Sequence, residues 1–470
     1  MNKLVSSIKE KELNKKTTTA NGMKARVSTA NHNLDLFFKI GASRGKNISE
    51  DFANAYSENK EHALRIAMWA RDIRGGAGER QLYLDIIKQL ELIDYKDAII
   101  LIDKIKDLGR YKDLFQINFT NQYLQNHVFS IAKKAIFEDN NALAAKWTPR
   151  KGIVANKFRK YLNLLPKDYR KALSERSNTI EQKMSKNDWS DINYSHVPSL
   201  AMSRYKKAFK KHDESGFDLY KTSLQDGTAK INAGAVYPYN ILHSLLKDRD
   251  EVVAKAQWDA LPNYLNDARI LPMVDVSGSM DQLISAGLNV SEIALSLGIY
   301  ISDKSKGSLK NTMLTFSGKP ALFVLDENLS LLNKVSTITT ITGRDCLNTD
   351  LGLAFKELLS FSSKNNVPAE DMPEYLLILS DMQFDYHSIR GKDVSALKMI
   401  KNEYKKAGYE MPKLVFWNLK SYDNVPAKFN SDGVALISGF SPSIMKSVLG
   451  TKNFNPMDVM LETIMNERYN

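Results

Sequence analysis

Asp275, Ser277 and Ser279 stand at alternate positions at the end of the apolar run Ile270–Val274, which is typical of a buried strand. In an open α/β sheet, ligands bind beyond the carboxyl ends of the strands, where these side chains would lie. Mg²⁺ prefers six oxygen ligands and keeps some of its waters. One carboxylate and two hydroxyls on a tight loop can present three oxygens to such an ion, and Gly278 lets the backbone fold closely around it. The alternative is that the serines only cap a following helix.

Two further oxygen donors occur later in the chain. Thr349 precedes a predicted helix, and Asp381 follows the apolar run Leu377–Leu379. Together with the Asp-x-Ser-x-Ser segment they resemble the metal-ion-dependent adhesion site of von Willebrand A domains. The resemblance implies that one divalent cation, Mg²⁺ or another such as Mn²⁺, is bound by Asp275, Ser277, Ser279, Thr349 and Asp381. Because most of these ligands are neutral, the ion would stay electrophilic and bind a carboxylate or phosphate oxygen of a partner. Asp350 either caps the helix after Thr349 or supports the ligands from behind.

The sequence does not predict an enzyme. Asp345 and Asp385 are the nearby acids, but they form no convincing acid–base pair, and Cys346 has no histidine near it in the sequence. The seven histidines lack metal-ligand spacing. Two-metal nucleases show carboxylate-rich clusters, whereas this segment is rich in hydroxyls.

Positive charge is concentrated in the N-terminal part of the chain. Residues 1–270 hold 46 Lys and Arg against 32 Asp and Glu, while residues 271–470 hold 20 against 22. Lys146–Arg176 and Ser203–Lys211 are the most basic stretches, and Trp147, Tyr161 and Tyr205 interleave with the bases. Such bases can neutralise phosphates, and such aromatics can stack on unpaired nucleotides. The alternative is amphipathic helices with aromatic cores and solvated lysines.

We therefore predict a set of residues within the basic part that bind a polyanion, and the family resemblance described below implies that this polyanion is RNA. Arg74 and Arg80, at the two ends of an Arg-Gly-Gly-x-Gly-Glu-Arg turn, are either phosphate contacts or internal ion-pair partners. The set consists of Arg74, Arg80, Lys146, Arg150, Lys151, Lys157, Arg159, Lys160, Arg170, Lys171, Arg204, Lys206, Lys207, Lys210 and Lys211.

The elements that carry these residues fall into two groups. After a flexible basic tail over residues 1–30, apolar residues recur at helical spacing, which predicts an α-helical repeat domain over residues 31–265. From residue 266 to 470, strand-length runs alternate with helical stretches, which predicts a doubly wound, mainly parallel sheet with helices on both faces. The predicted strands are Ile270–Val274, Thr312–Phe316, Ala321–Leu325, Tyr375–Leu379, Lys413–Trp417 and Val434–Ile437.

Further motifs resemble the Ro autoantigen (TROVE) class, and most closely its DUF2828 relatives. The segments concerned are Arg71–Arg80, Gly109–Leu114, Ala145–Pro149, Asn187–Trp189, Val197–Ser199 and Leu414–Leu419. The resemblance implies a HEAT-like helical repeat domain in front of a Rossmann-like von Willebrand A domain, and binding of structured or misfolded small RNA. The competing hypothesis is a metal-dependent protein–protein interaction module that binds a partner's Asp or Glu without RNA. The single cysteine and the lack of long apolar runs predict a cytoplasmic protein without membrane contact.

Overall fold

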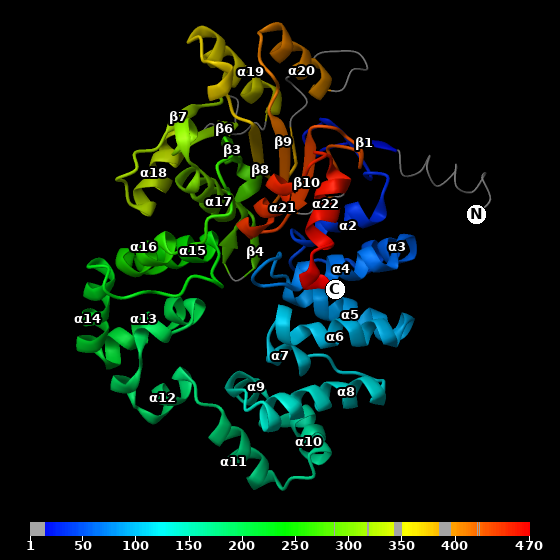
Figure 1. Cartoon of the computed structure of the whole chain (residues 1–470), viewed down its shortest axis with the longest axis vertical. Coiled ribbons are helices and arrows are strands. Elements are labelled where there is room, and N and C mark those ends of the chain that lie inside the picture. The colour runs from blue at the N-terminus through cyan, green and yellow to red at the C-terminus, as the bar shows by residue number, and fades with distance from the viewer. Residues whose placement is uncertain are drawn as a thin grey trace, which may run out of the picture. The chain divides into compact units, whose positions relative to one another are not determined.

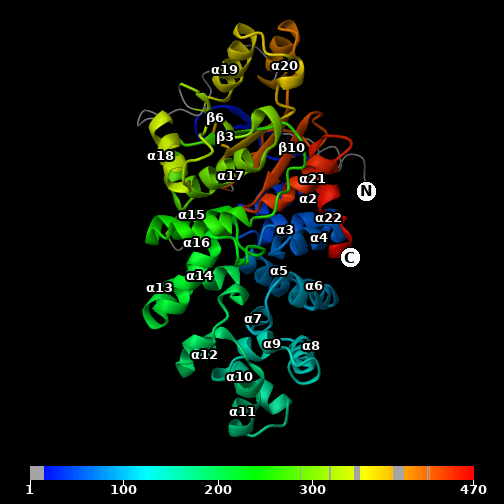
Figure 2. The same cartoon turned by 60° about the vertical axis from the view of Figure 1, so that its left-hand side comes forward.

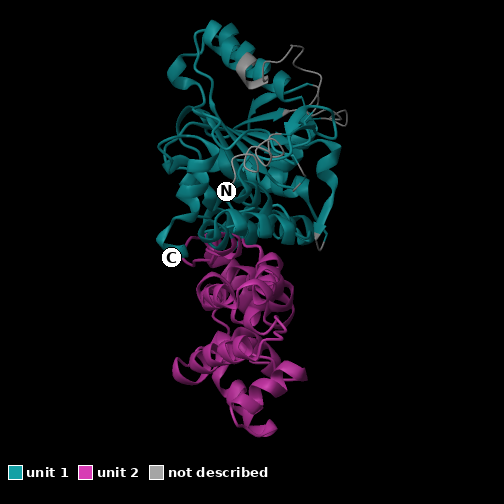
Figure 3. Cartoon of the chain, turned by 90° about the vertical axis from the view of Figure 1, so that its right-hand side faces the viewer, with its two compact units in different colours: residues 1–66, 75–77, 236–470 teal, residues 67–74, 78–235 magenta. Residues whose placement is uncertain are grey.

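The structure is a computed structural model that describes residues 15–285, 287–316, 319–342, 350–384, 396–420, 422 and 424–470. Its contacts divide the chain into two compact units, coloured separately in Figure 3. The first contains residues 1–66, 75–77 and 236–470, and the second contains residues 67–74 and 78–235. This division differs from the predicted boundary between residues 265 and 266, because four helices of the predicted repeat domain pack within the unit that holds the sheet.

The first unit is built on a six-stranded mixed sheet with the strand order β10-β9-β8-β3-β6-β7. Each strand agrees with a predicted one to within one residue at either end: β3 (Ile270–Asp275), β6 (Thr312–Phe316), β7 (Leu322–Val324), β8 (Tyr375–Ser380), β9 (Lys413–Asn418) and β10 (Val434–Ser438). All neighbours are parallel except β6 and β7, which are antiparallel. Because β3 and β8 are parallel neighbours, the residues that follow them meet at one edge of the sheet.

Helices cover both faces of the sheet, as predicted (Figures 1 and 2). On one face, α17 (Val290–Lys304) lies so close to β3 that a Cβ on Gly298 would be 2.4 Å from Val274 Cγ2. On the other face, Met273 belongs to a buried cluster with residues of α19 (Leu351–Lys364) and α20 (Ala396–Lys406). The alternation of Met273 and Val274 follows the two-residue period of a strand.

The remaining elements of the first unit surround this core. They are α2 (His32–Ile40), α3 (Ser49–Glu58), the start of α4 (Lys60–Arg71), α15 (Pro238–Asp248), α16 (Glu251–Asp259), the short pair β4 (Leu283–Ser285) and β5 (Leu288–Asn289), α18 (Leu331–Thr342), α21 (Met445–Gly450) and α22 (Pro456–Ile464). Both α2 and α22 pack on the edge strand β10.

The prediction of a flexible tail is wrong for residues 15–30. They form a hairpin of β1 (Lys16–Thr18) and β2 (Lys24–Arg26), which is attached to the sheet unit. Thr19 Oγ1 donates a hydrogen bond to the carbonyl of Phe384 (2.5 Å), and the backbone N–H of Ala20 donates to Gln383 Oε1 (2.7 Å). Polar groups in the turn thus attach the hairpin to the sheet unit. Because this attachment involves no apolar pattern, the sequence does not reveal it. Residues 1–14 lie outside the described part.

The second unit is helical. Its helices are the end of α4 and α5 (Arg80–Ile93), α6 (Tyr95–Leu108), α7 (Tyr111–Leu114), α8 (Gln122–Lys133), α9 (Ala142–Trp147), α10 (Gly152–Tyr161), α11 (Pro166–Arg176), α12 (Ile180–Lys186), α13 (Ser199–His212) and α14 (Glu214–Gln225). Asp94, Asn121 and Asn141 cap the starts of three of them through side-chain oxygens. The predicted mainly helical N-terminal part is confirmed.

Candidate metal centre and basic helical surface

Asp275 ends β3 and is fully buried. Its Oδ2 atom accepts a hydrogen bond from Ser380 Oγ (2.6 Å), and its Oδ1 atom accepts one from the backbone N–H of Ser277 (3.0 Å). The hydroxyl oxygens of Ser277 and Ser279 are 3.0 Å apart. The loop after β3 therefore gathers one carboxylate and two hydroxyls, as the sequence predicts.

Asp381 follows β8 directly and is also fully buried. Its Oδ1 atom accepts a hydrogen bond from the backbone N–H of Gln383 (3.1 Å). Its Oδ2 atom is buried and accepts no hydrogen bond from the described residues. A buried carboxylate oxygen without a hydrogen-bond donor is energetically unfavourable, and a bound cation would provide the partner that this oxygen needs.

Burial, together with the nearby charge of Asp381, raises the pKa of Asp275 to about 7, although hydrogen bonds from Ser380 and Ser277 partly offset both effects. Burial also raises the pKa of Asp381, although the Gln383 N–H and the Ser279 hydroxyl partly offset this effect. Two carboxyls that share one buried edge without a cation therefore resist ionisation. Oxygen donors of this kind, two carboxylates and two hydroxyls, fit a hard divalent cation.

The structure settles one alternative and leaves one ligand untested. Asp350 caps α19, because its Oδ1 accepts a hydrogen bond from the backbone N–H of Leu353 (3.0 Å). Thr349, the fifth predicted ligand, lies outside the described residues, as do Asp345, Cys346 and Asp385. Within the described ranges, no group of three or more His, Cys, Asp or Glu could hold a metal ion.

Ser380 was not among the predicted site residues. Its hydroxyl donates to Asp275 and accepts from the backbone N–H of Met382 (3.0 Å), so it fixes the carboxylate relative to the loop after β8. The sequence shows only a serine directly before the predicted ligand Asp381; that its strand lies beside β3 is known from the structure.

The predicted RNA-binding residues separate by their surroundings. Those that are exposed and form no ion pair with described residues are Arg74, Lys151, Lys157, Lys160, Arg170, Arg204, Lys207 and Lys211. Lys171 and Lys210 are exposed but pair with acids of their own or the next helix.

The other members of the predicted set have structural partners. Arg80 Nε is 2.5 Å from Asp113 Oδ1, so the internal ion pair is the correct one of its two interpretations. Lys146 pairs with Glu181 (2.6 Å). Arg150 donates to Ser177 Oγ (3.0 Å), and Arg159 donates to the carbonyl of Leu164 (2.7 Å). Lys206 is buried, with 4% of its surface exposed, which is incompatible with a surface contact to RNA.

The exposed bases of α13 lie on one face of the helix. Arg204, Lys207 and Lys211 are three and four residues apart, whereas Met202 and Phe209 are buried on the other side. This arrangement presents three positive charges in a row.

The three aromatic candidates are partly engaged within the helical unit. Trp147 lies beneath the ammonium groups of Lys112 (5.5 Å) and Lys146 (4.8 Å), measured to the ring centre. The Tyr161 ring packs 5.5 Å from that of Phe129, and the Tyr205 hydroxyl donates to Glu181 (3.4 Å). Core packing therefore explains much of their placement, while Tyr161 remains 41% exposed.

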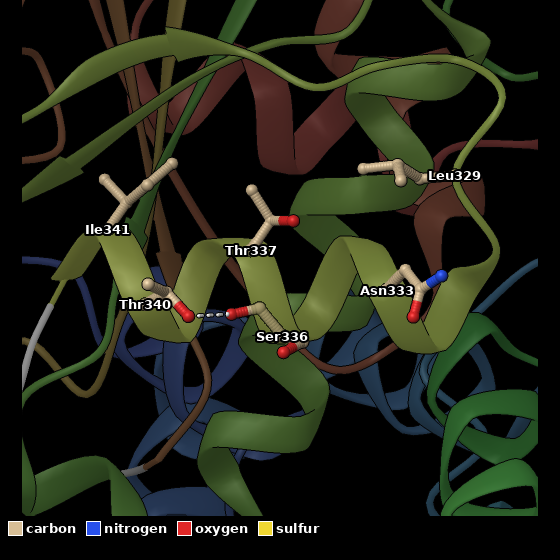
Figure 4. A pocket seen from close by; sticks show the side chains of 6 residues that line it. All are labelled: Leu329, Asn333, Ser336, Thr337, Thr340 and Ile341. Carbon is tan, nitrogen blue, oxygen red and sulfur yellow. Dashed lines mark hydrogen bonds between the residues drawn. The ribbon is translucent and has the colours of Figure 1, made fainter.

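Two surface hollows occur away from these residues. One, of about 360 Å³, lies along α18, and Figure 4 shows the side chains that line it: Leu329, Asn333, Ser336, Thr337, Thr340 and Ile341. The other, of about 650 Å³, lies between α21 and α22. Neither is lined by a candidate metal ligand. Within the described part, no helix combines the length and apolar character that crossing a bilayer requires.

Comparisons with known proteins agree with this architecture. Residues 125–269 match the model of the family DUF2828, and residues 270–469 match that of DUF7788, both described as domains of unknown function. An uncharacterized protein of Acanthamoeba polyphaga mimivirus is 26% identical over 505 residues, which cover 95% of this chain and 86% of that protein. The crystal structure of the Deinococcus radiodurans Ro (RSR) protein aligns with a TM-score of 0.50 and 12% identity, over 93% of this chain and all of that chain. The chain has a Ro-like fold. The DUF2828 match confirms the predicted resemblance for its segment.

Proposed function

We propose that this protein binds small structured or misfolded RNA through the exposed basic residues of its helical unit, and holds a divalent cation in its sheet unit. The supporting observation is the row of exposed bases on α13, which form no ion pair with described residues, in a chain with a Ro-like fold. The resemblance to the Ro class supplies the ligand type. In the same proposal the helical unit is a HEAT-like repeat array and the sheet unit is a von Willebrand A-type domain.

The RNA proposal is tested with a triple charge reversal and a matched control. Arg204→Glu, Lys207→Glu and Lys211→Glu change the helical unit, while Lys364→Glu, Lys405→Glu and Lys406→Glu make the same change in net charge on the sheet unit. RNA crosslinked to each variant in cells is sequenced, and the affinity for the enriched RNAs is measured by fluorescence anisotropy across a salt series.

We expect the first variant to lose the enriched RNAs and its salt slope to fall by about two, since each lost contact removes about 0.7 for single strands. The control variant should retain the enriched RNAs and the salt slope of the unchanged protein. Equal loss in the two variants would indicate non-specific attraction to a basic protein, and retention in both would refute the assigned surface.

For the metal centre, we propose Mg²⁺ or Mn²⁺ bound by Asp275, Ser277, Ser279, Thr349 and Asp381. The cation would supply an electrophilic position for one oxygen of a partner. The two carboxylates that would hold the cation are themselves oriented by hydrogen bonds, Asp275 by Ser380 and Asp381 by the Gln383 N–H. Among the described residues, none donates a hydrogen bond to Asp381 Oδ2, which supports this assignment. No role in catalysis is proposed.

The second candidate function is a metal-dependent protein interaction module that grips a partner's Asp or Glu. The same buried, hydroxyl-rich centre favours it. A protein that co-purifies in Mg²⁺, and is lost both on chelation and in Asp275→Ala, would support this function. A partner retained under both treatments would exclude the metal centre as its binding site.

A further inference from the structure

Lys420 lies at the same edge of the sheet as Asp381. Strands β8 and β9 are parallel and pair Ser380 with Asn418, and the backbone N–H of Leu419 donates to the carbonyl of Ser380 (3.0 Å). The backbone N–H of Lys420 then donates to Asn418 Oδ1 (3.1 Å). Strand register therefore brings the residues that follow both strands side by side.

The ammonium group of Lys420 is buried but has no hydrogen-bond partner among the described residues. It lies 5.2 Å from the centre of the Tyr422 ring, which holds the side chain in place. Its positive charge acts to lower the pKa of Asp381, so the two groups are close, yet they form no direct ion pair within 4.0 Å.

At this edge two buried charged atoms of opposite sign, Asp381 Oδ2 and Lys420 Nζ, thus lack hydrogen-bond partners among the described residues. A cation on the candidate centre would provide a partner for the carboxylate only. The ammonium would still need an acceptor, and an anion bound to the cation could supply it.

We propose that Lys420 and the cation together bind one phosphate group, with one phosphate oxygen on the cation and another accepting from Lys420. This inference rests on the proposed metal centre. Two carboxylates balance a divalent cation, so the charge of Lys420 remains for the ligand. Mg²⁺ in proteins is commonly held by one or two carboxylates plus a phosphate of the ligand, and lysine is a common point-charge contact to phosphate.

The test uses the full chain, Mg²⁺ and inorganic phosphate as the probe. Binding of Mg²⁺ alone, and of phosphate at saturating Mg²⁺, is measured by titration calorimetry for the unchanged protein, Lys420→Met and Lys420→Arg. Lys405→Met, at an exposed lysine of α20, serves as the control. We expect Lys420→Met to bind Mg²⁺ as well as the unchanged protein but phosphate at least tenfold more weakly, with partial recovery in Lys420→Arg.

The outcomes separate the two levels of the proposal. If the unchanged protein binds no Mg²⁺, the proposed metal centre fails. If it binds Mg²⁺ but phosphate binds equally to Lys420→Met, the role of Lys420 is refuted. If acetate competes as strongly as phosphate does, the site takes carboxylates, and the assignment of a phosphate ligand is overturned. Circular dichroism of each variant verifies that it is folded.

Discussion

The buried carboxyl of Asp275 makes the stability of the cation-free protein depend on pH in an unusual direction. Its pKa rises from 3.8 to about 7 on folding in the absence of a cation. The folded state therefore keeps a proton that the unfolded chain releases above about pH 4. This stabilisation is fully present below about pH 4, is lost as pH rises to about 7, and stays absent above it. At 1.36 kcal/mol for each pKa unit, the loss amounts to about 4 kcal/mol.

A divalent cation should remove this loss, because it replaces the proton as the partner of the carboxylate. We therefore expect Mg²⁺ to stabilise the protein much more at about pH 8 than at about pH 5, where protons compete for the same oxygens. Each kcal/mol corresponds to about 2 °C in Tm for a unit somewhat larger than 250 residues, so the expected difference is several degrees.

The assay is thermal unfolding at about pH 5 and about pH 8, each with Mg²⁺ or with a chelator. Asp275→Asn is the control, since a carboxamide does not titrate, and it should lose most of both the pH dependence and the Mg²⁺ effect. An equal rise in Tm with Mg²⁺ at both pH values would refute the reasoning, as would a pH dependence that survives in Asp275→Asn.

Three further predictions concern stability and are measured by chemical denaturation. Asp113→Asn should destabilise the helical unit by about 3–5 kcal/mol, because it removes the negative charge of the only carboxylate that pairs with the buried Arg71 guanidinium in the described structure. The control Lys171→Met breaks an exposed ion pair and should cost less than about 1 kcal/mol. Gly298→Ala should cost about 1–3 kcal/mol, because a methyl group there has no room against β3. Thr19→Val should cost about 1 kcal/mol and weaken Mg²⁺ binding, because it removes a hydrogen bond from the hairpin to the loop after β8; unchanged Mg²⁺ affinity would show that the hairpin does not support the centre.

The strands of the sheet could be predicted because each is a short apolar run buried on both faces. Helix α18 was not predicted, since β-branched residues such as Val335 and Ile338 favour strands over helices. Tertiary contacts override that preference: Ile338 is buried, and Lys334 Nζ is 2.6 Å from Asp303 Oδ1. The contacts come from a helix distant in sequence, so the local pattern could not reveal them.

The candidate centre shows the same limit. Asp275 and Asp381 could be predicted because each follows its own strand. Lys420 and Ser380 matter only through strand register, which the sequence does not display. Among the bases, composition identified the stretch on α13 but not the face, and so it could not separate buried Lys206 from exposed Lys207.

The N-terminal hairpin and the candidate centre are connected through Gln383. The side chain of Gln383 accepts a hydrogen bond from Ala20, its carbonyl accepts one from Asn21 Nδ2 (2.8 Å), and its N–H donates to Asp381. A cation bound at the proposed centre would restrain Asp381, and through the Gln383 N–H it would also restrain the loop on which the hairpin docks. Because such coupling is reciprocal, a cation that favours the docked hairpin is itself bound more tightly when the hairpin is docked. We therefore expect residues 15–27 to influence the affinity of the proposed centre for its cation, although none of them is a proposed ligand.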